Sequence, residues 1–481
     1  MAAPAARRIY GVETEYGLVG TTDGRRLPID EAANRLFAPI AREFATTNLF
    51  HRAGGRLYLD IGSHPEYATP ECTTAADLVT AQRAGDALLL DLAERAVAAE
   101  AEEGRDTTFR LFRNNIDPFG NTWGSHENYL VDRVLDPRHL GDWLVPFLVS
   151  RLLIGGAGHW RRGRFRLSQR GDVLGDLVSS QTTRSRPLIN TRDEPHADPE
   201  RHRRLHVISG DTNSLEHPMW LVVVATELVL RRAEVGGAPP TGPADPLAAL
   251  RAWNADPDAG VPAADGSRVT ARGLQRAYLA ATVGEADDAD ETGPGWRAWR
   301  DALDALDAGR PSGLEWDAKL RTIRAWRDRH GVPDTDPRLD ALDLRWHELG
   351  SEAGRPLGPA ALWEARHGVR HTTDEAVAAA TRLAPCATRA RVRGALLAAA
   401  QAHGRDHAVD WSGFEVRDLP GGTVALRLDD PFAAESAAAS GLVGRMGAEP
   451  RIRALGGFVP PPDAPPPDAG RAASGSGGGG R

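Results

Sequence analysis

Two strand-like segments near the start of the chain, residues 8–19 and 55–60, carry a charged or phenolic side chain at alternate positions. These side chains belong to Glu13, Glu15, Arg56, Tyr58 and Asp60. Because successive side chains of a strand point to opposite faces, each set lines one face. Leu57 and Leu59 point the other way, into a core. The pattern therefore predicts a sheet with one polar face, which either carries out chemistry or is covered by exposed ion pairs.

The rest of the pattern alternates helices with strands. Thr74 followed by Asp77 is typical of a helix N-terminus, and Gly104 is typical of its end. Further helices are predicted at residues 30–44, 139–154 and 218–233. Strands are predicted at residues 107–114 and 125–130, and the turn-rich residues between them predict a hairpin-like pair. Together these elements predict an α+β fold, a mixed sheet with helices packed against it.

The chain divides into three regions by composition. Residues 1–383 are expected to form the main domain, and residues 384–456 a small α/β domain. The small domain has a helical pattern near residues 387–402 and strand-like runs at 409–416 and 422–428. Residues 457–481 are rich in Pro, Gly and Ser, which bury too little apolar surface to offset the entropy of ordering, so a disordered tail is expected.

Composition excludes several classes of protein. No stretch of the 481 residues approaches the roughly 20 apolar residues of a membrane span, and no signal peptide is recognisable, so a cytoplasmic protein is expected. The net charge of −8 disfavours general nucleic-acid binding. Cys72 and Cys386 can form at most one disulfide. Lys319 is the one lysine of the sequence, and its surroundings do not match a Walker A loop, so that phosphate-binding motif is excluded. A codon bias towards Arg and Ala explains the rarity of lysine better than avoidance of self-modification does.

Arginine is abundant between residues 184 and 204, where guanidinium groups can bind phosphate oxygens or form ion pairs within an exposed loop.

His126, His196 and His206 lack the spacing of a zinc site. The chain has no Gly-x-Ser-x-Gly or His-Glu-x-x-His motif, and no Gly-x-Gly-x-x-Gly fingerprint follows a predicted strand. Carboxylates such as Glu13 and Glu66 are the ligands that Mg²⁺ prefers. Carboxylates and arginines together favour phosphoryl transfer from ATP as the reaction of this chain.

The order of these motifs resembles the Pup ligase and depupylase family, whose fold is related to that of glutamine synthetase. The resemblance extends to about Pro431 and rests on residues 11–17, 56–60, 62–69, 126–130 and 189–198. It implies an ATP-dependent reaction in which the C-terminal glutamate of Pup becomes a γ-glutamyl phosphate. A lysine amine of a target protein then displaces the phosphate. Pup and lysine-bearing proteins are the implied partners, with no nucleic acid and no membrane.

The resemblance also assigns roles to individual residues. It implies that Glu13, Tyr58 and Glu66 bind Mg²⁺ and that Arg56, Thr69 and Trp411 contact ATP. Asp60 matches the catalytic base, consistent with a lysine amine that is almost wholly protonated at neutral pH. Depupylases of the family have a long loop between the first two polar strands. That interval is short here, which favours a ligase; a depupylase, a non-catalytic Pup-binding adaptor and a small-molecule glutamate–amine ligase are the alternatives.

Overall fold

The computed structural model describes residues 7–180, 186–350 and 358–451. An eight-stranded sheet forms the centre, in the spatial order β11-β12-β13-β8-β1-β6-β5-β4. Its strands are β1 (Tyr10–Glu15), β4 (Asn48–Phe50), β5 (Arg56–Leu59), β6 (Pro65–Ala68), β8 (Ser125–Asp132), β11 (Asp176–Ser179), β12 (Pro187–Asn190) and β13 (His202–Val207). β11 and β12 run parallel and the other neighbours antiparallel, so the sheet is mixed, as predicted.

A second sheet corrects two predictions. The predicted strand at residues 8–19 is two strands, because the chain leaves the central sheet at Tyr16 and continues as β2 (Gly17–Thr22). β2 pairs with β3 (Arg25–Arg26) and β7 (Thr107–Phe112). β7 and β8 do not pair with each other. The loop between them contains an isolated bridge from Ile116 to Thr122, while β7 pairs with β2 and β8 pairs with β1. Both segments thus pass from one sheet to the other.

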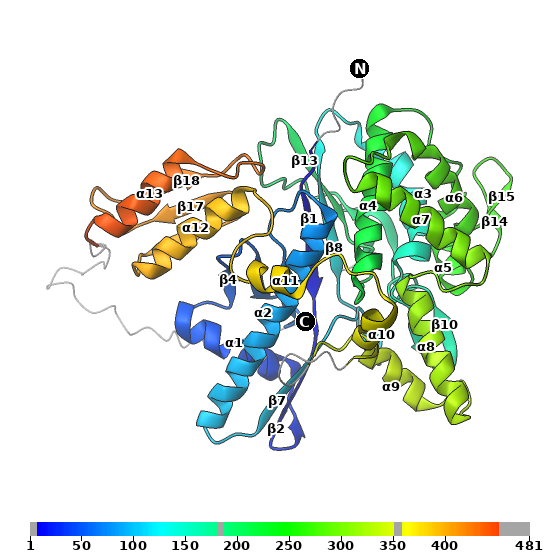
Figure 1. The fold of residues 1–481 in the computed structure, drawn as a ribbon, viewed down its shortest axis with the longest axis horizontal. Coiled ribbons are helices and arrows are strands. Elements are labelled where there is room, and N and C mark those ends of the chain that lie inside the picture. Colours follow the sequence, from blue (N-terminus) through cyan, green and yellow to red (C-terminus); the bar gives the residue numbers. More distant parts are fainter. Residues whose placement is uncertain (1–6, 181–185, 351–357, 452–481) are drawn as a thin grey trace, which may run out of the picture.

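Helices cover one face of the central sheet. The main helices are α1 (Ile29–Phe44), α2 (Ala75–Glu102), α3 (Pro137–Gly155), α4 (Glu216–Val235), α5 (Pro246–Ala255), α6 (Ala271–Ala281) and α7 (Thr292–Asp307). α2 begins as predicted, since the Thr74 side chain accepts a hydrogen bond from the backbone N–H of Asp77. The largest hydrophobic core joins this face to α3, α4, α6 and α7, which Figure 1 shows gathered on one flank.

Shorter elements complete the main body. They are β9 (His159–Arg161), β10 (Arg164–Arg166), β14 (Val261–Pro262), β15 (Arg268–Val269), the 3-10 turn at Val283–Glu285, α8 (Glu315–His330), α9 (Pro337–Trp346), α10 (Pro359–His367) and α11 (Asp374–Ala380). Cys72 and Cys386 are both buried and carry free thiols. No helix of the described residues has the length and apolarity needed to cross a membrane.

The C-terminal elements have a hydrophobic core of their own. They are α12 (Arg389–Ala402), β16 (His407–Val409), β17 (Gly413–Val416), β18 (Val424–Arg427) and α13 (Ala437–Ala448). The predicted run at residues 409–416 is two strands joined by a turn. Phe50 of β4 contributes to this core, and Figure 1 shows the unit beside β4. The domain boundary at 383/384 stays a prediction, and the predicted disordered tail at 457–481 lies outside the described residues.

Candidate active site

One face of the central sheet collects the polar side chains of four strands. Glu15 pairs with Glu66 across β1 and β6, and Tyr58 pairs with Glu66 across β5 and β6. Glu13 lies two residues before Glu15 and pairs with His126 of β8. Because directly opposite residues of neighbouring strands point to the same face, these five side chains share one face. The predicted polar stripe is therefore wider than the sequence alone indicated.

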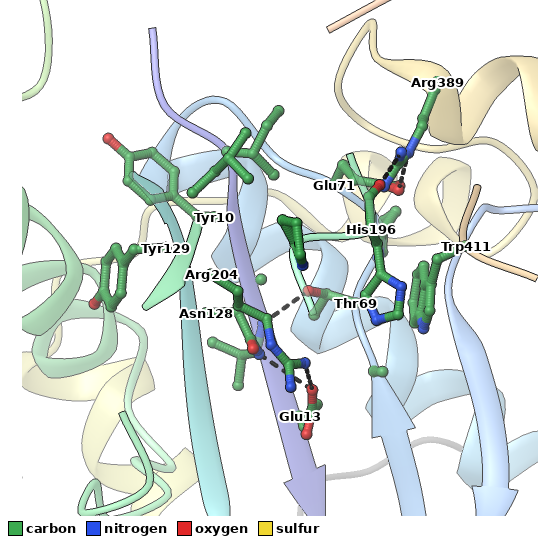
Figure 2. A pocket seen from close by; sticks show the side chains of 17 residues that line it. Tyr10, Glu13, Thr69, Glu71, Asn128, Tyr129, His196, Arg204, Arg389 and Trp411 are labelled. Carbon is green, nitrogen blue, oxygen red and sulfur yellow. Dashed lines mark hydrogen bonds and ion pairs between the residues drawn. The ribbon is translucent and has the colours of Figure 1, made fainter. Parts of the chain in front are cut away.

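Glu13 is surrounded by nitrogen atoms. The side-chain amide of Asn128 donates a hydrogen bond to Oε1 of Glu13 (3.2 Å), and Nδ1 of His126 lies 3.2 Å from Oε2. Arg204 and His206 of β13 each approach the carboxylate to 3.9 Å. Burial opposes ionisation, but the hydrogen bond and charge of His126 and the charges of His206 and Arg204 outweigh it, lowering the pKa of Glu13 to about 2. Figure 2 shows Asn128 and Arg204 directed at Glu13.

Glu66 has the opposite electrostatic environment. Its side chain is buried, and burial together with the charges of Glu13 and Glu15 raises its pKa well above the usual range. Burial, followed by the charges of Glu66 and Glu13, likewise raises the pKa of the Tyr58 phenol. Carboxylates that repel one another in this way are stabilised by a bound cation.

The donor atoms on this face fit a divalent cation. Ligand atoms of Glu13, His126 and His206 lie within 4.8 Å of one another, as do those of Glu15, Glu66 and His126. The Nε2 atom of His206 is buried and has no hydrogen-bond partner in the part of the chain that the structure describes, which is a costly arrangement unless another group binds it. The set of Glu15, Glu66 and His126 is the richer in carboxylate oxygens, which suit Mg²⁺ or Mn²⁺. Sequence reasoning gave no metal role to His126 and His206, because only the register of β1, β8 and β13 reveals their position.

Asp60 follows β5 at the same end of the sheet as Glu15. Its Oδ1 accepts a hydrogen bond from the backbone N–H of His64 (2.7 Å), and Nδ1 of His64 lies 3.4 Å from Oδ2. Burial raises the pKa of the Asp60 carboxyl, but the hydrogen bonds and charge of His64 lower it by more. The pKa of Asp60 therefore lies below its ordinary value. Carboxylate and imidazole atoms of Glu15, Asp60 and His64 lie within 4.8 Å of one another. Asp60 is therefore ionised and adjacent to the carboxylate cluster.

A pocket opens at the other end of the same face. Thr69 and Trp411 line it together with Glu13, His196 and Arg204. The hydroxyl of Thr69 accepts a hydrogen bond from the backbone N–H of Val12 (3.0 Å), which fixes Thr69 at the pocket wall. Figure 2 shows the rings of His196 and Trp411 on one side of the pocket and Glu13 at its lower end. A flat apolar ring system could stack at one end while charged groups contact Glu13 and Arg204.

Arg56 lies beside this pocket and outside its lining. Its Nε donates a hydrogen bond to Asn48 (2.6 Å), and its guanidinium group sits 4.3 Å above the centre of the Tyr58 ring. The arginine-rich block does not converge on one point: Arg204 reaches Glu13, whereas Arg203 faces Asp193 at 3.8 Å. Residues 181–185 of that block lie outside the described residues.

A family model described as Pup-ligase protein matches residues 8–415. The chain belongs to the Pup-ligase family. A Pup–protein ligase of Micrococcus luteus is 42% identical over 470 residues, covering 92% of this chain and 99% of the relative. A Pup–protein ligase of Brachybacterium faecium is 39% identical over 487 residues, covering 95% and 99%. Both relatives carry the ligase name, which favours a ligase over a depupylase.

Solved Pup-ligase structures share the fold. The complex between Pup and its ligase PafA matches with a TM-score of 0.84 and 35% identity, covering 92% of this chain and 91% of that chain. The Pup ligase PafA in complex with ADP matches with a TM-score of 0.78 and 36% identity, covering 88% and 94%. The predicted α+β class and the predicted family are therefore confirmed.

Proposed function

We propose that this chain is an ATP-dependent ligase that joins the C-terminal glutamate of Pup to lysine side chains of target proteins. The names of its relatives support this reaction, and the solved complexes of PafA with Pup and with ADP support both substrates. The observation that carries the proposal is the layout of one sheet face. A pocket lined by Thr69 and Trp411 and an ionised Asp60 flank the Glu13, Glu15 and Glu66 cluster from opposite ends.

ATP would occupy the pocket with its base beside Trp411 and its phosphates toward Glu13. Thr69 and Trp411 are proposed contacts because they line that pocket. Arg56 is a proposed phosphate contact from the neighbouring strand, which requires its side chain to leave the Tyr58 ring. Arg204 adds a guanidinium group at the pocket. We infer a cytoplasmic location for this activity, because ATP is its proposed donor.

The carboxylate cluster would hold Mg²⁺. Glu13, Tyr58 and Glu66 are the proposed ligand residues, and the raised pKa of Glu66 supports the assignment because a cation would relieve the repulsion among these acids. Mg²⁺, when bound, supplies charge neutralisation for the transferred phosphoryl group. His126 and Asn128 hold the Glu13 carboxylate in place.

In the first step a γ-carboxylate oxygen of the Pup glutamate attacks the terminal phosphorus of ATP. The bond between that phosphorus and the ADP oxygen breaks, giving γ-glutamyl phosphate and ADP. The side chains of Arg204 and Arg56 supply positive charge near the transferred group. Binding both substrates along one rigid sheet face makes the reaction effectively intramolecular.

In the second step the lysine amine attacks the γ-carbonyl carbon of the acyl phosphate. A carbon–nitrogen bond forms, the carbon–oxygen bond to phosphate breaks, and phosphate leaves. The lysine ammonium loses two protons: Asp60 takes the first, and the second leaves with the products. His64 keeps the Asp60 carboxylate oriented through two contacts to its two oxygens. The small unit proposed at residues 384–456 would contribute Trp411 to the ATP pocket and help to hold Pup.

Trapping of the acyl phosphate tests this proposal. The protein is incubated with Pup ending in glutamate, ATP, Mg²⁺ and hydroxylamine, and Pup hydroxamate is measured by mass spectrometry. We expect hydroxamate to form only with ATP and Mg²⁺, in equal amount to ADP. Hydroxamate formation that persists without ATP, or ADP release without any hydroxamate, would contradict an acyl-phosphate ligase.

A further inference from the structure

We propose that a separate cavity beside Asp60 binds the lysine-bearing segment of the acceptor protein. The inference rests on the proposed function and adds the site for the second substrate. The cavity has a volume of about 570 Å³. It is lined by β2, β3, β7, the loop that follows β7, the loop between β5 and β6, the first residue of α1 and one residue of α9. This volume lies within the usual range for small-ligand sites and accommodates a lysine side chain with neighbouring backbone.

The inner end of the cavity is made by the residues that contact Asp60. His64 lines the cavity and holds both Asp60 oxygens, and Gly62 lines it too. A Cβ atom on Gly62 would lie 2.8 Å from Nδ1 of His64 and 3.2 Å from Oδ2 of Asp60, so a glycine at this position packs directly against the Asp60–His64 pair. An amine bound at this end of the cavity would lie beside the two residues that adjoin the Asp60 carboxylate.

The cavity walls suit the stem of a lysine. Trp123 lines one wall, and its ring stacks on His64 with centroids 5.0 Å apart and an interplanar angle of 29°. Leu18 and Phe112 contribute further apolar surface from β2 and β7. Aromatic and aliphatic walls bind the methylene chain of lysine while leaving its charged end in a polar region.

The polar groups of the cavity call for a hydrogen-bond donor with positive charge. Asn114 lines the cavity and is only 4% exposed, and no group of the described residues donates a hydrogen bond to its Oδ1. Asp117 also lines the cavity, and Glu15 and Asp60 are negative groups close to His64 at its inner end. A buried acceptor oxygen without a donor is costly, and an ammonium group would satisfy it. Arg26 balances Asp117 within the lining, so the negative charge at the inner end comes from Glu15 and Asp60 beside His64.

The rim of the cavity has the character of a protein-binding surface. Ile29 and Phe119 line the cavity and are 40% and 79% exposed, and Ile61, next to Gly62, is fully exposed. A hydrogen bond of 2.6 Å from Ser63 to Asp30 ties the Ile61 loop to the start of α1. Apolar residues gathered around a polar cavity are typical of sites that bind another protein.

The cavity and the ATP pocket lie at opposite ends of one continuous segment. The pocket is lined by residues from Ile9 to Glu13, and the cavity by Gly17, Leu18 and Val19. Figure 1 shows β2 and β7 projecting downward, away from the C-terminal unit that supplies Trp411. ATP and the acceptor amine would therefore approach the carboxylate cluster from different sides, so neither blocks the other.

Substitution of the rim tests the proposal. Phe119→Arg and Ile61→Arg place a like charge where a lysine must enter, and both positions are exposed, so the fold should persist. Val235→Arg is the matched control, because Val235 is 74% exposed at the end of α4. Steady-state kinetics are measured with an acceptor protein, and hydroxamate formation with hydroxylamine, which is small enough to bypass the acceptor site.

We expect both rim variants to raise the acceptor KM at least about fivefold. Their hydroxamate rate and Pup KM should match those of Val235→Arg. A raised Pup KM with slower hydroxamate formation would mean that the cavity receives Pup, and would overturn the proposal. Unchanged acceptor kinetics would overturn it as well. Absence of hydroxamate with the unsubstituted protein would instead reject the proposed function, and the acceptor site with it.

Discussion

Glu15 and Glu66 lie directly opposite each other in the register of β1 and β6, with the Glu13 side chain on the same face. Burial and the neighbouring carboxylates raise the pKa of Glu66, so the folded protein holds a proton there that the unfolded chain releases. The stability of the metal-free protein should therefore fall as pH rises above 4.5, the ordinary pKa of a glutamate. A preformed cation site therefore lowers the stability of the metal-free protein, because its carboxylates repel one another.

Glu66→Gln should stabilise the metal-free protein and abolish its response to Mg²⁺. Thermal unfolding in EDTA at pH 8 should shift upward by about 2–4 °C, because the amide carries no charge near Glu13 and Glu15. Addition of Mg²⁺ and nucleotide should raise Tm for the unsubstituted protein and for Glu94→Gln, an exposed control on α2, but not for Glu66→Gln. A lower Tm for Glu66→Gln in EDTA would contradict the repulsion described here.

Trp411→Ala should weaken nucleotide binding more than Trp411→Phe. Trp411 lines the proposed ATP pocket, and its ring also contacts Phe50 at 5.0 Å between centroids. Loss of the ring removes a stacking surface, so we expect the ADP Kd to rise by about tenfold, which corresponds to about 1.4 kcal/mol. Calorimetric titration measures this change. Equal ADP affinity for the alanine and phenylalanine variants would exclude an aromatic contact with the base.

Glu71→Gln should loosen the C-terminal unit. Glu71 follows β6 and forms buried ion pairs with Arg389 (2.7 Å) and Arg393 (2.6 Å) of α12. Removing this charge leaves the two buried guanidinium groups with backbone carbonyl partners but without a carboxylate, which costs about 3–5 kcal/mol. Urea unfolding should show this loss, and hydrogen exchange should rise in α12. Asp429→Asn is the control, because its ion pair with Arg427 is exposed and contributes at most about 1 kcal/mol. A similar loss of stability in both variants would contradict the role of Glu71 in holding α12.

The folded protein should not modify itself. Lys319 is the one lysine of the chain and is fully buried. Its Nζ lies 2.9 Å from Asp343, 2.7 Å from His347 and 2.9 Å from the Gly158 carbonyl oxygen. Peptide mapping after a ligation reaction without acceptor should find Lys319 unmodified. Arg25→Lys, which places a lysine on the exposed strand β3, provides a matched positive control for self-modification between molecules. Modification of Lys319 in the native protein would contradict its burial.

Local patterns in the sequence predicted much of the fold. The alternation of Glu13 and Glu15 gave a strand with a polar face, and Thr74 with Asp77 gave the start of α2. The break at Tyr16 was not predictable, because β1 and β2 have the same local pattern and differ only in their partners. Tyr16 itself is fully buried and its hydroxyl donates a hydrogen bond to Asp86 (2.7 Å), a contact made across 70 residues.

The site was only partly predictable for the same reason. Strand periodicity placed Glu13 and Tyr58 on polar faces of their strands, and the family resemblance grouped Glu66 with them. His126, His206 and Arg204 join them only through the pairing of β1, β8 and β13. No pattern in the sequence indicated the acceptor cavity. Its walls come from β2, β7 and the residue before β6, which the sheet topology brings together.

Formation of the isopeptide bond tests the central claim most directly. The unsubstituted protein and Asp60→Asn are each incubated with Pup ending in glutamate, ATP, Mg²⁺ and a lysine-bearing acceptor, and the products are sequenced by mass spectrometry. We expect an ATP-dependent bond between the γ-carboxyl group of the Pup glutamate and a lysine ε-amine, formed at least about 100-fold more slowly by Asp60→Asn. Cleavage of a preformed conjugate with no ligation, or Pup binding with neither reaction, would contradict the ligase assignment.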